Sequence, residues 1–162
     1  MASIRFQTLW VRWSIATLLV LLVLLWWFAQ RVEYRNSDED IRSHFSALSI
    51  DPQIHRYEID DRTVRFVEFG ADTLPVTIMV HGAPSSLSFF TRFYEDTALL
   101  RRTILVGVDR PGYGYSDFGK SVISIADQAR YLQPIINRYA AQGRKVVLAA
   151  SSYGGAVVAK LA

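Results

Sequence analysis

The sequence predicts an α/β fold with a mostly parallel sheet and helices on both faces, preceded by one N-terminal transmembrane helix. Three observations support this prediction. Residues 13–29 carry no charged side chain. From residue 76 onward, short apolar runs alternate with helical patterns, which is typical of right-handed crossovers between parallel strands. The last apolar run, 146–150, ends in a serine- and glycine-rich turn before another helical pattern.

The composition excludes several classes of protein. A 51% hydrophobic and 20% charged chain is not disordered, and 162 residues suffice for about one domain. The formal charge of +3 is scattered, without a basic patch interleaved with aromatic residues, so nucleic acid is not an expected partner. The chain has no cysteine, and its three histidines lack metal-ligand spacing, so we expect no metal and no cofactor.

The N-terminal segment predicts a membrane anchor. Residues 1–12 form a short tail, and residues 13–29 are about as long as the shortest spanning helices. Aromatic residues stand at both ends, where the two bilayer interfaces would lie: Trp10, Trp13, Trp26, Trp27 and Phe28. A cleaved signal peptide is the alternative, but it needs small residues at the cleavage site, and Trp27-Phe28-Ala29 is a poor match.

The anchor predicts a single-pass membrane protein. Arginines flank the segment on both sides, so their count does not decide its orientation. We expect the globular part to lie on the non-cytoplasmic side. Residues 30–51 form a polar connector, in which 36–40 are a good helix start and His44 is expected on the surface.

Residues 52–162 form the predicted globular domain. Two alternating runs, 54–59 and 63–69, flank Asp60-Asp61 and predict a β-hairpin near a sheet edge, with one polar face that carries His55. Buried strands are expected at 76–80, 103–108 and 146–150, and helices at about 86–100 and 124–143. Gly112 and Gly114 lack the third glycine of a dinucleotide-binding loop, so that interpretation is not favoured.

The turn after the last strand predicts a serine nucleophile. A serine on a tight strand-to-helix turn presents its hydroxyl above the sheet and needs small residues two positions before and after it. Ser152 meets this requirement with Ala150 and Gly154. The backbone N–H of Tyr153 would then face the oxyanion at the N-terminus of the helix. The competing interpretation is an ordinary buried strand followed by a Ser/Gly turn.

Three loops in this order resemble those of the α/β-hydrolase family, in particular its esterase, lipase and aminopeptidase-like members. They are residues 81–84 (HGAP), 109–116 (DRPGYGYS) and 151–155 (SSYGG), each after a buried strand. The resemblance covers roughly residues 52–162. It implies that Ser152 is the nucleophile and that the N–H groups of Ala83 and Tyr153 form the oxyanion hole. It further implies that His81, with Gly82 and Pro84, shapes the oxyanion loop and is not the general base.

The chain departs from the family pattern in two ways. Ala150 replaces the usual glycine, and the sequence stops shortly after Ser152, before the acid and histidine that complete the family's triad. We therefore interpret the chain as an N-terminal, truncated part of an α/β hydrolase, with its serine strand at a sheet edge. An aspartate at position 152 would indicate epoxide or haloalkane chemistry, which serine does not.

Two functions are consistent with these residues. The first is a membrane-anchored serine hydrolase that acts on a small-molecule carboxylic ester or related acyl substrate through an acyl-enzyme. In that case this chain, which lacks the triad acid and histidine, would be inactive by itself. The alternative is a non-catalytic binding or scaffolding module of the same fold, tethered to a membrane. The sequence does not indicate an oligomeric state.

Overall fold

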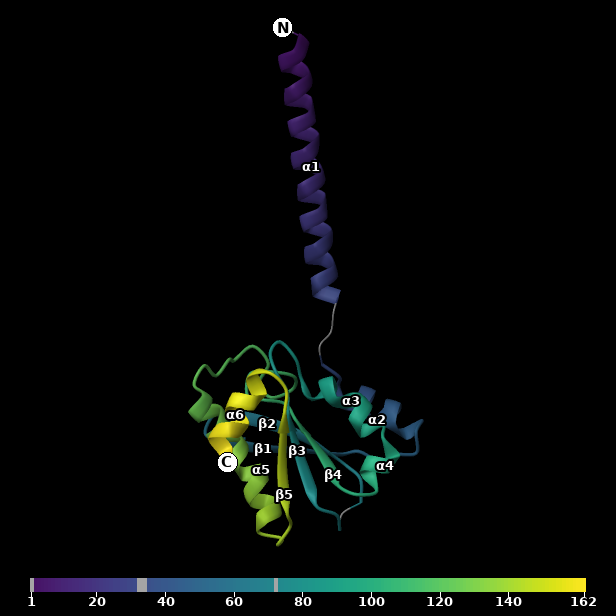
Figure 1. The fold of residues 1–162 in the computed structure, drawn as a ribbon, viewed down its shortest axis with the longest axis vertical. Helices are drawn as coiled ribbons and strands as arrows, with labels where there is room; N and C mark the ends of the chain where they lie inside the picture. The colour runs from purple at the N-terminus through teal and green to yellow at the C-terminus, as the bar shows by residue number, and fades with distance from the viewer. Residues whose placement is uncertain (1, 32–34, 72) are drawn as a thin grey trace. The chain divides into compact units, whose positions relative to one another are not determined.

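The chain folds into two compact units, Met1–Glu33 and Tyr34–Ala162. The structure, a computed structural model, describes residues 2–31, 35–71 and 73–162, and the side chains of 13–28, 35–71 and 73–162. The first unit consists of helix α1, Ala2–Arg31, which includes most of the predicted tail (Figure 1). Met1 and residues 32–34 of the predicted connector lie outside the described residues.

The second unit is built on a five-stranded sheet with the order β1-β2-β4-β3-β5. The strands are β1 (Gln53–Ile59), β2 (Arg62–Phe69), β3 (Val76–Val80), β4 (Ile104–Val108) and β5 (Val146–Ala150). β3 pairs in parallel with β4 and β5, whereas β2 pairs antiparallel with β1 and β4. The sheet is therefore mixed and not mostly parallel, because the hairpin contributes both antiparallel pairings. β5, the serine strand, lies at one edge, as predicted.

The hairpin forms as predicted, with Ile59 opposite Arg62 across the turn. The prediction of a polar face on this hairpin is wrong for its second strand. Val64 and Phe66 are buried on one face of β2, and Val67 and Phe69 are buried on the other. β2 is an inner strand of the sheet, between β1 and β4, and both of its faces are covered.

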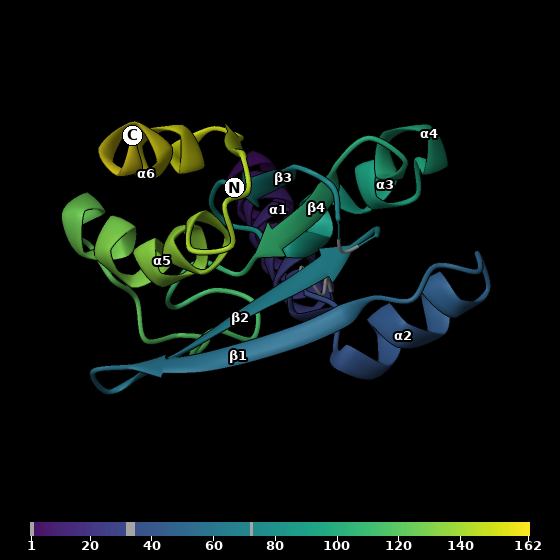
Figure 2. The same cartoon turned by 90° about the horizontal axis from the view of Figure 1, so that it is seen from below.

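Helices cover both faces of the sheet, as predicted (Figure 2). On one face lie α5 (Ile125–Ala140) and α6 (Tyr153–Leu161). On the other lie α2 (Asp38–Ser46), the 3₁₀ turn η1 (Leu87–Phe90), α3 (Thr91–Tyr94) and α4 (Thr97–Leu100). Two buried clusters match these two layers: one joins β2, β3 and β4 to α5, and the other joins them to α2, η1 and α3.

The helix caps explain where the helices begin. Ser37 caps α2 in a capping box with Asp40, and the Ser124 hydroxyl accepts from the Asp127 N–H at the start of α5. The predicted single helix at 86–100 is wrong, because the segment divides into η1, α3 and α4. α3 ends at Tyr94, and Asp96 caps the start of α4. The Asp96 side chain accepts hydrogen bonds from the N–H groups of Ala98 at 2.8 Å and Leu99 at 3.1 Å.

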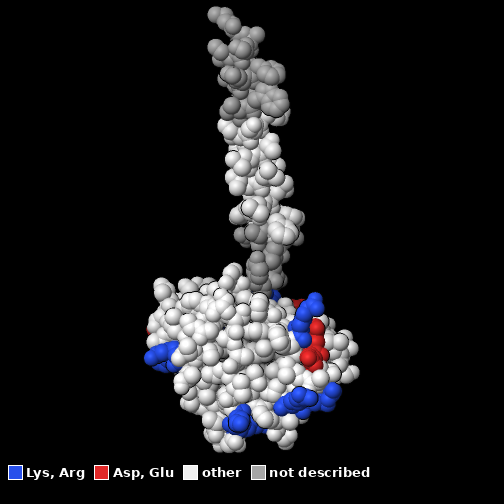
Figure 3. Space-filling view, in the orientation of Figure 1, with Lys and Arg blue, Asp and Glu red and all other residues white. Residues whose placement is uncertain are grey.

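The described side chains of α1 are exposed and uncharged. Residues 13–28 carry no Lys, Arg, Asp or Glu, and this stretch is white in Figure 3. Leu21 is 57% exposed and Val23 is 62% exposed. The predicted transmembrane helix is not confirmed: among the residues that the structure describes, no helix is long and apolar enough to cross a membrane. The predicted span ends at Ala29, whose side chain lies outside the described ones.

Candidate active site

Ser152 lies on a sharp turn between β5 and α6. Its backbone angles are φ 50° and ψ −124°, which an L-residue other than glycine rarely adopts. Holding such a conformation costs about 1–3 kcal/mol, and strain of this kind is concentrated at functional sites. Ser151, in contrast, continues the β5–β3 ladder by donating its N–H to the Val80 carbonyl at 3.1 Å. The strained position is therefore Ser152 and not Ser151.

Two glycines let the backbone approach this turn closely. A Cβ atom added to Gly154 would lie 2.3 Å from the carbonyl oxygen of Val80, at the end of β3. A Cβ atom added to Gly82 would lie 3.0 Å from the Cβ and 3.6 Å from the Oγ of Ser152. The turn thus has room only for a residue without a side chain at 154, and the loop after β3 lies directly against the serine.

Two backbone amides, one in the turn at Ser152 and one in the loop that lies against it, have no acceptor in the part of the chain that the structure describes. One is the N–H of Tyr153, the first residue of α6, and the other is the N–H of Ala83, which follows Gly82. The first amides of a helix have no partner within it. An unpaired amide at a helix N-terminus, together with a second one in a loop that lies against the nucleophile, is suited to binding an oxygen that becomes negative during acyl transfer.

His81 is fully buried beneath this loop, and both of its ring nitrogens are occupied. Nε2 accepts a hydrogen bond from the Arg110 N–H at 3.0 Å, so Nδ1 carries the proton and donates to the Gly82 carbonyl at 2.6 Å. Burial lowers the pKa of His81 to about 3, with the Gly82 carbonyl opposing and the Arg110 charge adding to the shift. The His81 ring is therefore neutral, and its two hydrogen bonds hold the loop in position. It has no free lone pair that could accept a proton from Ser152.

The other two histidines belong to different elements. His44 on α2 contacts Glu95 at 2.7 Å. His55 on β1, at the sheet edge opposite β5, contacts Glu68 at 3.2 Å and stacks on Phe66. None of the three histidines of this chain is therefore placed as a base for Ser152. Of the residues predicted for the site, the structure brings together Ser152, Tyr153, Gly154, His81 and Gly82, with Ala83 and Pro84 following in the same loop.

Comparison with known proteins assigns this architecture. Residues 77–162, just over half of the chain, match the alpha/beta hydrolase family. The chain belongs to this family. The match includes β3, β4 and β5 with the three loops that follow them, which are the segments that carried the resemblance in the sequence. No curated protein sequence matches the chain.

Several solved structures are similar in fold to this chain. Cfl2 from Burkholderia cenocepacia is 23% identical with a TM-score of 0.59, over 68% of this chain and 36% of that one. A loop variant of the haloalkane dehalogenase DbeA from Bradyrhizobium elkanii is 27% identical with a TM-score of 0.55, over 67% and 35%. A membrane phospholipase A, described as a bacterial virulence factor, is 24% identical with a TM-score of 0.56, over 90% and 46%.

The chain spans about a third of the length of the first two of these proteins. Ser152 and α6 (Tyr153–Leu161) both lie within the residues that match the family. No group of His, Asp and Glu side chains among the described residues is arranged to hold a metal ion.

Sequence reasoning missed Arg110, which follows β4 and is fully buried. Its guanidinium donates through Nε to the His81 carbonyl at 2.7 Å and through Nη2 to the Gly82 carbonyl at 2.9 Å. A signal was present, because two charged residues, Asp109 and Arg110, directly follow a fully apolar strand. Burial lowers the pKa of Arg110, and the neighbouring Tyr113 and Tyr153 oppose this effect.

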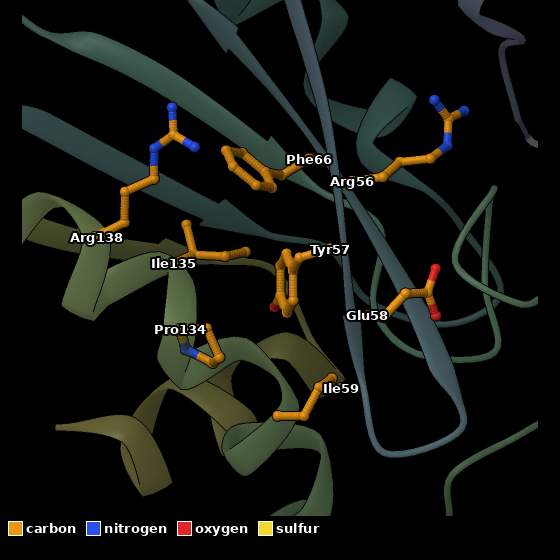
Figure 4. Close-up of a pocket in the computed structure, with 8 residues that line it drawn as sticks. All are labelled: Arg56, Tyr57, Glu58, Ile59, Phe66, Pro134, Ile135 and Arg138. Atoms are coloured by element: carbon orange, nitrogen blue, oxygen red, sulfur yellow. The ribbon is translucent and has the colours of Figure 1, made fainter.

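A groove of about 340 Å³ lies apart from this loop cluster, between β1 and α5 (Figure 4). The side chains of Tyr57, Ile59, Pro134 and Ile135 converge there, whereas Arg56 and Glu58 point to the other side of β1. None of the eight lining residues was predicted for the active site, and the groove belongs to the hairpin edge, remote in sheet order from β5.

Proposed function

We propose that this chain supplies the nucleophile and the oxyanion hole of a membrane-attached serine hydrolase that cleaves carboxylic esters or related acyl compounds. The conformation of Ser152 carries the proposal: a serine at φ 50° between β5 and α6, next to two unpaired amides. The structural relatives named as a haloalkane dehalogenase and a phospholipase A support hydrolysis in general. The serine ester chemistry rests on residue 152 of this chain.

The proposed reaction proceeds through an acyl-enzyme. The Ser152 hydroxyl gives its proton to the general base as its Oγ attacks the carbonyl carbon, and the oxygen that becomes negative faces the N–H groups of Ala83 and Tyr153. The carbon–oxygen bond to the alcohol breaks, and the alcohol leaves with a proton from the general acid. Water then attacks the acyl carbon, which releases the carboxylic acid and restores the serine.

The general base is proposed to come from outside residues 1–162, together with the acid that orients it. A base must come within about 2.6–3.2 Å of the proton that it accepts. His44 and His55 belong to other elements, and both nitrogens of His81 are occupied. In the family order, an acid and a histidine follow the serine. Residues 1–162 alone should therefore hydrolyse p-nitrophenyl esters at well below about 1 s⁻¹.

The test is labelling of the full-length protein, in detergent, with a fluorophosphonate. We expect the adduct on Ser152, and we expect Ser152→Ala to lose the label and about 10⁴-fold or more in kcat. Ser151→Ala is the matched control, and it should keep both. An adduct mapped to Ser151, or turnover retained in Ser152→Ala, would exclude the assignment. A full-length protein without label or turnover would favour the non-catalytic binding module.

The membrane attachment is proposed from the exposed apolar surface of α1. Its described side chains include many large hydrophobic residues that are more than half exposed, and a surface of this kind is costly in water. We expect the protein to remain with membranes during alkaline carbonate extraction. Leu21→Arg should weaken insertion by about 2.5–3.5 kcal/mol. Release of the wild-type protein into the soluble fraction would contradict the proposal.

The globular unit is proposed to lie on the non-cytoplasmic side. Residues 1–162 contain no cysteine, so Gln142→Cys places one label site in this chain, on its exposed surface, and the protein without this substitution is the control. A membrane-impermeant maleimide should label this variant in intact cells. Labelling only after the cells are broken would place the unit in the cytoplasm.

A further inference from the structure

Arg110 is a buried cation whose partners are neutral. It is 0% exposed, and no carboxylate among the described residues forms an ion pair with it. Its three donor nitrogens bond the His81 carbonyl at 2.7 Å, the Gly82 carbonyl at 2.9 Å and the Gln128 side-chain oxygen at 2.6 Å. Burying a charge without an opposite charge is costly, so these bonds must compensate for the lost hydration.

The bonds to His81 and Gly82 fix the direction of the following peptide. The Gly82–Ala83 peptide is trans, and in a planar trans peptide the C=O and the N–H point in opposite directions. Arg110 and the Nδ1–H of His81 both hold the Gly82 oxygen from one side. The Ala83 N–H is thereby directed to the other side of this peptide. Gly82 itself lies against Ser152.

The same guanidinium contacts the second half of the oxyanion hole. It lies over the ring of Tyr153 at 4.8 Å from the ring centre and over the ring of Tyr113 at 4.3 Å. Tyr153 contributes the other unpaired N–H, directly after Ser152. A cation on an aromatic face is attracted by the negative charge distribution above the ring. One side chain therefore links the loop after β3 to the start of α6.

We propose that Arg110 is a positioning residue that sets the direction of the Ala83 N–H relative to Tyr153, and so determines how well the site stabilises the oxyanion. This inference rests on the proposed function. Arg110 does not touch the substrate, since its donors are bonded to His81, Gly82 and Gln128. Lysine cannot replace it, because one ammonium nitrogen cannot bond two successive carbonyls and Gln128 in the geometry of a planar guanidinium.

The kinetic test compares Arg110→Lys with wild type in the full-length protein. We expect kcat to fall about 10²–10³-fold, as when one oxyanion donor is lost, with KM changed less than about threefold. The Ki of a trifluoromethyl ketone, which mimics the tetrahedral intermediate, should rise in parallel with the loss in kcat/KM. The matched control is Tyr139→Phe, which removes a partly buried hydrogen bond to Glu68 and should leave kcat unchanged.

A second measurement does not depend on activity. Hydrogen exchange of residues 81–86 should become at least tenfold faster in Arg110→Lys, while residues 53–59 of β1 keep the wild-type rate. Gln128→Met, which removes the Nη1 acceptor, should shift both measurements in the same direction by a smaller factor. This variant provides the test if Arg110→Lys does not fold.

The outcomes separate the two claims. Unchanged exchange at 81–86 overturns the role of Arg110, whether or not the protein is active. Faster exchange with unchanged kcat and unchanged inhibitor Ki also overturns it, since the loop would then not control the oxyanion. If the wild-type protein has no Ser152-dependent turnover, the proposed function fails, and the exchange rates alone decide whether Arg110 holds the loop.

Discussion

The domain contains two fully buried arginines, Arg65 and Arg110, with opposite kinds of partner. Arg65 on β2 pairs with Asp109 at 2.7 Å and with Asp38 at 2.9 Å, so its charge meets carboxylates. Arg110, the residue after Asp109, bonds backbone carbonyls and a side-chain amide instead. Asp109 and Arg110, adjacent residues after β4, thus have different partners: Asp109 pairs with Arg65, and Arg110 bonds the loop after β3 and Gln128.

The difference concerns what each charge stabilises. In the Arg65 region, Asp109 also accepts from the N–H groups of Leu87 and Tyr115, both at 2.8 Å, so the ion pair holds two loops at once. The charges of Arg65 and Asp109 compensate each other, and the pair stabilises the fold by holding these loops in place. In the Arg110 region, the positive charge has no carboxylate to cancel it and lies beside the amides proposed to bind the oxyanion. In the proposal above, the hydrogen bonds of Arg110 set the direction of the Ala83 N–H.

The largest effect should come from breaking the Arg65 region. Asp109→Ala leaves Arg65 buried without its fully buried partner, and it also leaves the amides of Leu87 and Tyr115 unpaired. Removing one partner of a buried ion pair costs about 3–5 kcal/mol. Urea unfolding of the full chain in detergent, monitored by far-UV circular dichroism, measures this loss. A loss below about 1 kcal/mol would show that Arg65 does not depend on Asp109.

The strands and the serine turn could be predicted because their signals are local. Apolar runs of five or six residues mark β3, β4 and β5, and the polar Asp60-Asp61 marks the hairpin turn. The family order of the three loops then placed the site. Ser152 and Gly154 are also local, since small residues on both sides of a serine are a direct requirement of the turn.

The two arginines could not be predicted because their partners are distant in the sequence. Arg65 alternates with Val64 and Phe66 in β2, a pattern that predicted one polar face for the hairpin but did not predict a buried arginine. It is buried because Asp109, 44 residues later, supplies the opposite charge. The carbonyls that Arg110 bonds lie 28 and 29 residues earlier, and a backbone carbonyl has no signature in the sequence. The helix predicted at 86–100 is too long for a different reason, because Asp96 caps a separate helix, α4, within that range.

The next effect concerns the pH dependence of the Arg110 region. His81 is held neutral, with its pKa lowered from 6.5 to about 3 by burial. Below pH 6.5 the unfolded chain takes up a proton on this residue and the folded chain does not. Stability is therefore lost as the pH falls from about 6.5 toward 3, at up to about 1.4 kcal/mol per pH unit.

His81→Asn isolates this contribution, because the substitution removes the titrating ring and leaves every other titratable side chain in place. The variant should be less stable at pH 7, since it loses the ring between Gly82 and Arg110. Its stability should fall less steeply than that of wild type between pH 6 and about 4. Unfolding curves at several pH values measure both slopes, and equal slopes would show that His81 is not held neutral by the fold.

The smallest effect should come from the exposed end of the Arg65 region. Asp38 on α2 bonds Arg56 and Arg65, each at 2.9 Å, but its side chain is 35% exposed, and water screens it. Burial raises the pKa of Asp38, the bonds from Arg56 and Arg65 lower it, and the net direction is down. Its contribution is thus present above its ordinary pKa of 3.8 and is lost as the pH falls through the lower, folded value.

Asp38→Ala should cost about 0.5–1 kcal/mol at pH 7, because Arg65 keeps Asp109 as its buried partner. The loss should shrink in high salt, which screens an exposed pair more than a buried one. Asp38→Asn is the matched control, since it keeps a hydrogen-bond acceptor without the charge. If Asp38→Ala destabilised the fold as much as Asp109→Ala, Arg65 would depend equally on its exposed and its buried carboxylate. The charge of Arg65, unlike that of Arg110, would then be compensated as much by helix α2, which carries Asp38, as by the loop that carries Asp109.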